Sequence, residues 1–190
     1  MLKSIMVCLF LITICVSTSI YAQMKTDLTG GIVIGPTFSK TESQSQVSFE
    51  GRAFARRNLT EVLQGEIGMG VGKIAGDNFN TFILPVDLRL LFFPLQSESW
   101  KPYLYAGFGY LFYKVDDQPV NSDSSAKLSG WAANVPVGIG MQFKVDEKKS
   151  FEISAGYNRT STADLNAIRH GNDRDAFWNV MIGFVINTPK

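Results

Sequence analysis

Few residues of this chain have the types and spacing that catalysis or cofactor binding requires. The glycine-rich segment Gly68-Met-Gly-Val-Gly-Lys73 invites comparison with a phosphate-binding loop. However, Ile67 stands where the first glycine of G-x-x-x-x-G-K-[ST] belongs, and Ile74 stands where its hydroxyl residue belongs. His170 is the single histidine, and one histidine among scattered aspartates lacks the ligand spacing of a metal site. We therefore predict no cofactor and no metal, and we interpret the glycines as small residues that line an interior.

Charged side chains offer a different kind of chemistry, because several of them occupy alternate positions in otherwise apolar segments. The six that do so are Glu50, Arg52, Glu66, Asp87, Arg89 and Glu152. Both signs are present, and burial of any one of them without a partner would cost several kcal/mol. If these side chains share an interior, they must pair with one another. The pattern thus predicts a paired polar network that replaces a hydrophobic core.

The overall composition argues against two classes of protein, nucleic-acid-binding proteins and bundles of membrane helices. The 190 residues carry 18 Lys and Arg against 17 Asp and Glu, a formal net charge of +1. The clustered basic surface of a nucleic-acid-binding protein is therefore not expected. The mean hydropathy of +0.05 excludes a bundle of membrane helices, each of which needs about 20 nearly continuous apolar residues.

The N-terminal segment has the pattern of a secretory signal. Lys3 precedes an apolar run from Ile5 to Val16, and small and polar residues lead from there to Ala22. We predict that residues 1–22 are a cleaved signal peptide and that residues 23–190 form one domain. An uncleaved N-terminal anchor is the alternative. Both cysteines fall in the predicted signal, so the mature chain must gain its stability without disulfides.

After residue 23 the hydrophobic pattern has a period of two, which indicates strands with two different faces. In the segment from Trp131 to Phe143, the odd positions are apolar and the even positions are small or polar. Eight segments of this kind are expected, at about 28–38, 47–56, 63–72, 82–92, 102–114, 131–143, 151–158 and 176–186. Ordinary strands have about 5–6 residues. Seven of these segments have 10 to 13 residues and the segment 151–158 has 8, lengths that instead suit a membrane-crossing strand, which needs about 9–11.

The connections between these segments alternate in length. Short turns are expected at 57–60, 94–101 and 146–149, and longer polar loops at 39–46, 75–80, 116–127 and 161–174. Short turns on one rim and longer loops on the other are typical of bacterial outer-membrane barrels. We predict an all-β fold, an eight-stranded antiparallel up-and-down transmembrane β-barrel preceded by the signal peptide. The loops at 116–127 and 161–174 are the segments that we expect to carry any binding.

Aromatic residues near both ends of the apolar faces indicate which face meets lipid. They are Phe82, Phe92, Trp131, Phe143, Phe151, Tyr157, Trp178 and Phe184. Two aromatic girdles around an aliphatic band are typical of a membrane barrel, so the apolar faces are predicted to point outward and the six charges inward. A soluble, lipocalin-like binder with its apolar face inward is the alternative.

The signal ending Tyr21-Ala22-Gln23, the eight alternating strands and the terminal segment from Phe177 to Ile186 together support a family resemblance. The chain resembles the small outer-membrane β-barrel proteins of Gram-negative bacteria, the family with an outer-membrane-protein β-barrel domain similar to the transmembrane domain of OmpA. The likeness covers nearly all of residues 23–190. It implies residence in the outer membrane, contact with its lipid and lipopolysaccharide, and insertion by the barrel-assembly machinery.

The function that we expect is structural and surface-presenting, without enzymatic activity, and the sequence does not specify an extracellular ligand. An eight-stranded barrel is only wide enough for its own side chains, which favours a filled lumen over the alternative of a narrow conduit for small or hydrophobic molecules. A second alternative comes from the resemblance. Some eight-stranded outer-membrane barrels modify lipid A with His and Ser or Asp at the rim, which would implicate His170 with Ser161, Asp164 or Asp173.

Overall fold

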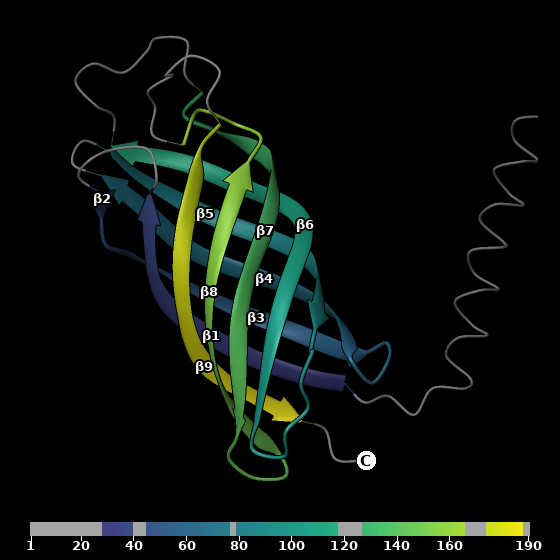
Figure 1. Cartoon of the computed structure of the whole chain (residues 1–190). Coiled ribbons are helices and arrows are strands. Elements are labelled where there is room, and N and C mark those ends of the chain that lie inside the picture. Colours follow the sequence, from purple (N-terminus) through teal and green to yellow (C-terminus); the bar gives the residue numbers. More distant parts are fainter. Residues whose placement is uncertain (1–27, 40–44, 77–78, 118–126, 166–173, 188–190) are drawn as a thin grey trace, which may run out of the picture.

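The computed structural model describes residues 28–39, 45–76, 79–117, 127–165 and 174–187, which form a barrel of β-strands (Figure 1). The strands are β1 (Leu28–Ser39), β2 (Ser45–Gln46), β3 (Ser48–Asn58), β4 (Leu63–Gly76), β5 (Phe79–Phe92), β6 (Trp100–Asp117), β7 (Ser129–Lys144), β8 (Lys149–Thr160) and β9 (Ala176–Asn187). None of the described segments contains a helix that is long and apolar enough to span a membrane. The predicted signal peptide, residues 1–22, lies outside the described residues and stays a prediction.

The strands follow an up-and-down order that closes on itself. Each long strand pairs antiparallel with its neighbours in sequence, and β1 pairs with β9 to complete the cycle (Figure 1). The two-residue strand β2 extends β3 past Val47 and pairs with β4 through Ser45 and Gly76. Closure leaves no long unpaired strand edge, which is the condition for a sheet to lie in lipid. The predicted eight-stranded antiparallel barrel is thus confirmed.

The strands are longer than predicted, and one predicted loop is wrong. The long strands have 11 to 18 residues. In the segment predicted as a loop at 75–80, Ala75 pairs with Asn80 and Gly76 pairs with Phe79, so β4 extends into it as far as Gly76 and β5 begins within it at Phe79. The polarity of Asn80 suggested a loop, but this residue lies between two buried side chains, Phe79 and Thr81, that point into the barrel. Strand β6 likewise continues through Asp117, inside the predicted loop at 116–127.

The alternation in the sequence translates directly into two faces. On β7, Trp131 is 64% exposed and Ile139 is 59% exposed, whereas Ala132 and Asn134 between them are buried. Every long strand carries such an outward apolar row, and the rows together form a continuous belt around the barrel. Monomeric soluble proteins rarely expose an apolar surface of this extent. The belt therefore requires lipid as its solvent.

The aromatic residues predicted as girdles all lie on strands, on the outward face. Pairing brings several of them into ring contact, with centroid distances of 5.3 Å for Phe112–Trp131, 4.8 Å for Tyr157–Trp178, 6.4 Å for Phe143–Phe151 and 5.8 Å for Phe151–Phe184. The first two pairs lie toward the loop end and the last two toward the turn end. Phe82 and Phe92 lie near opposite ends of β5. Aromatic rings at both depths are typical of the two interfaces of a membrane.

Candidate functional site

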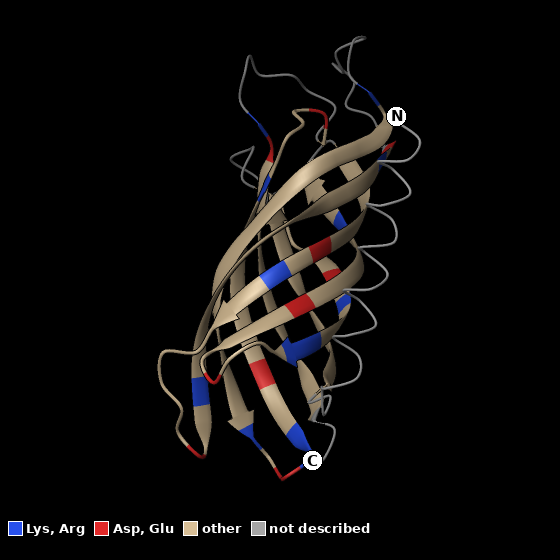
Figure 2. Ribbon diagram, turned by 90° about the vertical axis from the view of Figure 1, so that its right-hand side faces the viewer, with Lys and Arg blue, Asp and Glu red and all other residues tan. Residues whose placement is uncertain are grey.

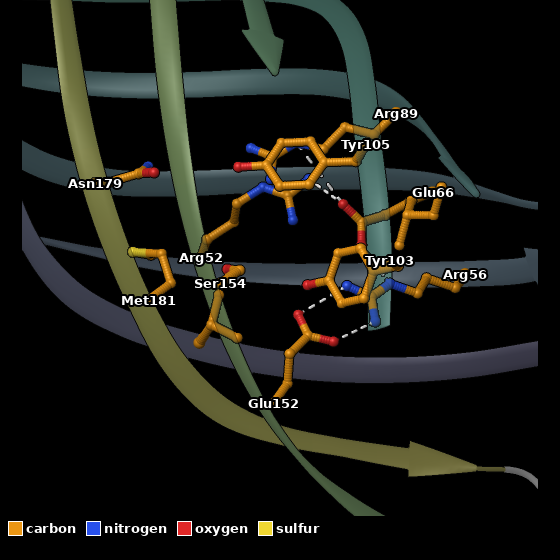
Figure 3. A pocket seen from close by; sticks show the side chains of 12 residues that line it. Arg52, Arg56, Glu66, Arg89, Tyr103, Tyr105, Glu152, Ser154, Asn179 and Met181 are labelled. Atoms are coloured by element: carbon orange, nitrogen blue, oxygen red, sulfur yellow. Dashed lines mark hydrogen bonds and ion pairs between the residues drawn. The ribbon is translucent and has the colours of Figure 1, made fainter. Parts of the chain in front are cut away.

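Six charged side chains of the strands meet inside the barrel. Figure 2 shows positively and negatively charged positions along the strands, in blue and red. The six side chains come from four strands that the closed sheet arranges around one space (Figure 3). Arg52 and Arg56 lie on β3, Glu66 on β4, Asp87 and Arg89 on β5, and Glu152 on β8. The strand register places opposite charges directly across from one another, as in the pairs Arg56–Glu66 and Glu66–Arg89. We call these six residues the lumen network.

Glu66 is the centre of the lumen network. Its Oε1 atom lies 2.8 Å from Arg52 Nη2, and its Oε2 atom lies 2.5 Å from Arg56 Nε. Arg89 Nε is 3.8 Å from the same Oε1 atom. The carboxylate of Glu66 is almost wholly buried, so its charge depends on the close contacts with Arg52 and Arg56 and on the more distant charge of Arg89 in place of water.

Asp87, on the strand next to that of Glu66, binds two of these three arginines, Arg52 and Arg89. Its Oδ1 atom accepts hydrogen bonds from Arg52 Nη2 at 2.6 Å and from Arg89 Nε at 2.9 Å. Its Oδ2 atom accepts from Arg89 Nη2 at 3.0 Å, so Arg89 holds Asp87 with two parallel bonds. Paired bonds of this kind between guanidinium and carboxylate are the strongest hydrogen bonds available to side chains.

Arg56 and Glu152 join opposite walls of the barrel, because β3 and β8 are not neighbours in the sheet. Arg56 Nη1 lies 2.5 Å from Glu152 Oε2, and Arg56 Nη2 donates to Glu152 Oε1 at 2.9 Å. Gln142 Nε2 also donates to Glu152, at 3.0 Å. The Arg56 guanidinium lies 4.0 Å from the centre of the Phe54 ring. This pair therefore closes the lumen across its width (Figure 3).

Glu50 was also predicted to belong to the network, and the structure places it differently. Its side chain is buried, but its partner is the amide of Asn179, whose Nδ2 donates to Glu50 Oε2 at 3.1 Å. Within the described residues Glu50 forms no ion pair, because Arg52 directs its guanidinium toward Glu66 and Asp87. Ion pairs join the other five predicted residues, and Arg56 links Glu152 to the rest through Glu66.

Arg56 and two tyrosines were not predicted as network residues. Arg56 alternates in step with Glu50 and Arg52, so the period-two signal was present in the sequence. Tyr103 and Tyr105 carried no such signal, because their strand is apolar on both faces. The Arg56 guanidinium lies 5.5 Å from the Tyr103 ring centre, and the Arg89 guanidinium lies 4.9 Å from that of Tyr105.

Glycines on the inner face give these large side chains their room. A Cβ atom on Gly68 would lie 2.0 Å from Arg52 Nη2, and one on Gly140 would lie 2.3 Å from Tyr103 Cζ. The cavity among the network side chains has a volume of about 10 Å³. That volume is close to the minimum for a single water molecule. The middle of the lumen is therefore filled.

An apolar layer closes the loop end of the lumen. Residues 161–165, which follow β8, fold into the mouth of the barrel, and Leu165 there is 3% exposed. Thr81 Oγ1 donates to the Leu165 carbonyl at 2.5 Å, and the Leu165 N–H donates to Asp175 Oδ2 at 2.7 Å. The side chains that form this layer are Ile74, Phe79, Ile83, Leu111, Tyr113, Ala132, Leu165 and Phe177. We call this set the apolar plug.

Two of the four residues named for the enzyme alternative, Ser161 and Asp164, lie among the residues that the structure describes. His170 and Asp173 lie outside the described residues. Ser161 Oγ accepts a hydrogen bond from the Ala133 N–H at 2.9 Å, and Asp164 is buried beside Tyr113. Both line a groove of about 830 Å³ at the loop rim. Across the described part of the chain, no group of three or more His, Cys, Asp or Glu residues is arranged to hold a metal ion.

A closed antiparallel barrel with an apolar exterior bounded by aromatic rings and an interior of paired charges defines an integral membrane β-barrel. The chain belongs to the family described as outer membrane protein beta-barrel domain, whose model matches residues 6–185. It is therefore a barrel of the bacterial outer membrane, and the soluble lipocalin-like alternative is set aside.

Solved structures of outer-membrane barrels share this fold at low sequence identity. Neisserial surface protein A superposes with a TM-score of 0.64 at 12% identity, over 85% of this chain and 97% of that one. The attachment invasion locus protein Ail of Yersinia pestis gives 0.54 at 14%, over 87% and 100%. The outer membrane enzyme PagL gives 0.52 at 14%, over 84% and 99%. No curated protein matches the sequence.

Proposed function

We propose that this barrel is a closed, non-conducting scaffold that presents its loops at the cell surface and that it is not an enzyme. The observation that carries the proposal is the double closure of the lumen. The lumen network fills the middle of the barrel, and the apolar plug fills its loop end. A solute crossing the barrel would have to separate buried ion pairs and also displace Leu165. The sealed interior supports a structural role over that of a narrow conduit.

The proposal assigns a different task to each surface. The outer belt contacts outer-membrane lipid and lipopolysaccharide, the barrel-assembly machinery inserts the chain, and the loops face the exterior. Residues 1–22 are removed as a signal peptide during export. Similarity to PagL does not by itself favour an enzyme, because at 14% identity it reflects the shared fold.

Conductance across planar bilayers tests the closure. The purified barrel, refolded into lipid, is expected to give no stepwise current under conditions in which an open porin, used as the positive control, conducts. Discrete current steps from the wild-type barrel would overturn the proposal and favour the conduit. A gel that compares heated with unheated samples verifies folding, because only a folded barrel changes its migration on heating.

Surface presentation is tested by cysteine labelling of intact cells. Both natural cysteines lie in the predicted signal, so a substitution in the mature chain adds a single reactive thiol. Leu128→Cys at the loop rim is expected to react with a membrane-impermeant maleimide on intact cells. Lys148→Cys in the β7–β8 turn is expected to react only after the outer membrane is opened. The reverse pattern would contradict the orientation.

A further inference from the structure

The loop rim carries a groove that the sealed lumen does not explain. Its volume is about 830 Å³, and its walls come from Tyr113 of β6, from residues 127–131 at the start of β7, from the segment after β8 and from Arg174. The lining residues used below are Lys127, Trp131, Ser161, Asp164 and Arg174. We call this space the rim groove. It is separate from the lumen network, with which it shares no lining residue.

The rim groove presents positive charge. Lys127 and Arg174 are both exposed, and neither forms an ion pair with another residue that the structure describes. The acidic side chain of the groove is Asp164, which is 5% exposed and accepts hydrogen bonds from Tyr113 Oη at 3.4 Å and Thr162 Oγ1 at 3.2 Å. Because internal donors occupy Asp164, the two cations remain available for an anion from outside.

The groove also offers a hydroxyl donor and an aromatic surface. Ser161 Oγ accepts the Ala133 N–H, which leaves the hydroxyl proton for another acceptor. Trp131 is 64% exposed and contacts Phe112 on the outer face of the barrel, in the girdle at the loop end. Tryptophan in such a girdle lies at the level of the lipid headgroups. One wall of the groove is therefore open to the membrane plane.

A ligand that reaches both the cations and Trp131 must itself lie at the membrane surface. We propose that the rim groove binds the phosphorylated sugar headgroup of an outer-leaflet glycolipid, the chemistry of lipid A. Phosphate oxygens pair with Lys127 and with the forked guanidinium of Arg174, which suits phosphate geometry. The sugar ring lies against Trp131, and Ser161 donates to a phosphate or hydroxyl oxygen. This inference rests on the proposed orientation, which places the groove in the outer leaflet.

Binding in detergent solution tests the groove without depending on orientation. The refolded barrel is titrated with bisphosphorylated lipid A, and binding is followed by native mass spectrometry. The Lys127→Gln/Arg174→Gln variant is expected to bind at least tenfold more weakly than wild type. Lys148→Gln/Lys149→Gln is the matched control, because it removes the same charge from the exposed turn at the opposite rim. It is expected to bind as wild type does.

Three further ligands test the chemistry that the groove recognises, and one further variant tests its aromatic wall. Dephosphorylated lipid A and phosphatidylglycerol are each expected to bind at least tenfold more weakly than bisphosphorylated lipid A, and inorganic phosphate at millimolar concentration is expected not to compete. Trp131→Ala, which keeps both cations, is expected to weaken lipid A binding severalfold while the barrel still shows its heat-dependent gel shift.

Four results would overturn the inference. They are wild-type affinity in the Lys127→Gln/Arg174→Gln variant, equal weakening in the control variant, equal binding of phosphatidylglycerol, and full competition by inorganic phosphate. If the labelling experiment instead shows the opposite orientation, the proposed surface presentation is wrong. The binding of lipid A in detergent does not depend on orientation and is judged separately.

Discussion

At the scale of the residue, Arg56 shows how the interior depends on the balance of its charges. It neutralises two carboxylates, Glu66 on the adjacent strand and Glu152 across the lumen. A buried ion pair gives little net stability relative to a well-packed apolar pair, but removal of one partner leaves an uncompensated buried charge. The sensitivity of the barrel to substitution therefore depends on which charges remain, rather than on how many pairs are lost.

A double-mutant cycle between Arg56 and Glu152 measures this effect. Arg56→Ala is expected to lower the free energy of unfolding by about 3–5 kcal/mol, because Glu152 is left buried without its partner. In the Glu152→Ala background the same substitution is expected to cost less, with a coupling energy of about 1–3 kcal/mol. Denaturant unfolding in lipid vesicles provides the measurement, and Lys101→Ala at an exposed position is the control. Strictly additive single effects would contradict the cross-lumen pair.

At the scale of the element, the hydrogen-bonded pairing between neighbouring strands, here called a seam, is interrupted at some positions. The β1–β9 pairing skips the residues between Ile34 and Thr37, where Pro36 lies. The β4–β5 and β6–β7 pairings have similar two-residue gaps opposite Pro85 and Pro136. Proline has no N–H, so each of these three prolines removes a hydrogen-bond donor from the pairing with one neighbouring strand. The pairing of the same strand with its other neighbour continues past the proline. At these gaps the backbone pairing between the two strands is locally interrupted.

The β1–β9 seam predicts a contrast between two glycines. A Cβ atom on Gly35 would lie 1.8 Å from the Val180 carbonyl oxygen, which belongs to the backbone and cannot move without shifting β9. Gly35→Ala is therefore expected to lower the free energy of unfolding by about 1–3 kcal/mol. The Cβ of Gly51→Ala on the adjacent strand would meet nothing within 4 Å, and this variant is expected to be neutral or slightly more stable. Thermal unfolding of both variants checks the contrast, and equal effects would contradict it.

At the scale of the whole molecule, the barrel reverses the usual arrangement of a soluble domain. Its outer belt is apolar, and much of its interior is charged, including Glu66 and Glu152, which are at most 4% exposed. Lipid stabilises the belt, whereas closure of the sheet supplies the backbone hydrogen bonds that lipid cannot. Stability in this fold therefore depends on where along the barrel axis a charge is introduced.

Two valines test this dependence on depth. Val137 lies in the middle of β7 with its side chain outward, and Val145 lies just beyond the end of that strand. Val137→Arg is expected to cost about 2–4 kcal/mol of unfolding free energy, and Val145→Arg about 0–1 kcal/mol. Denaturant titration of both variants in lipid vesicles provides the comparison. A similar cost at both positions would show that the belt does not lie in hydrocarbon.

The sequence by itself determined the number of strands, their two faces and the side of the sheet that carries charge. It could do so because side chains alternate strictly along a strand, so that period-two patterning reads directly as inside and outside. It did not determine where the strands end at residues 75–80, because a polar residue such as Asn80 near the end of a strand has the same sequence signal as one in a loop.

Only the tertiary structure decided which charges meet. Closure of β1 on β9 brings β3 opposite β8 and thereby pairs Arg56 with Glu152. The same closure brings Asn179 of β9 to Glu50, which accepts its hydrogen bond. Folding of residues 161–165 into the mouth placed Leu165 in the apolar plug and formed one wall of the rim groove. Such contacts depend on register and curvature, which link residues far apart in the chain and leave no periodic trace in it.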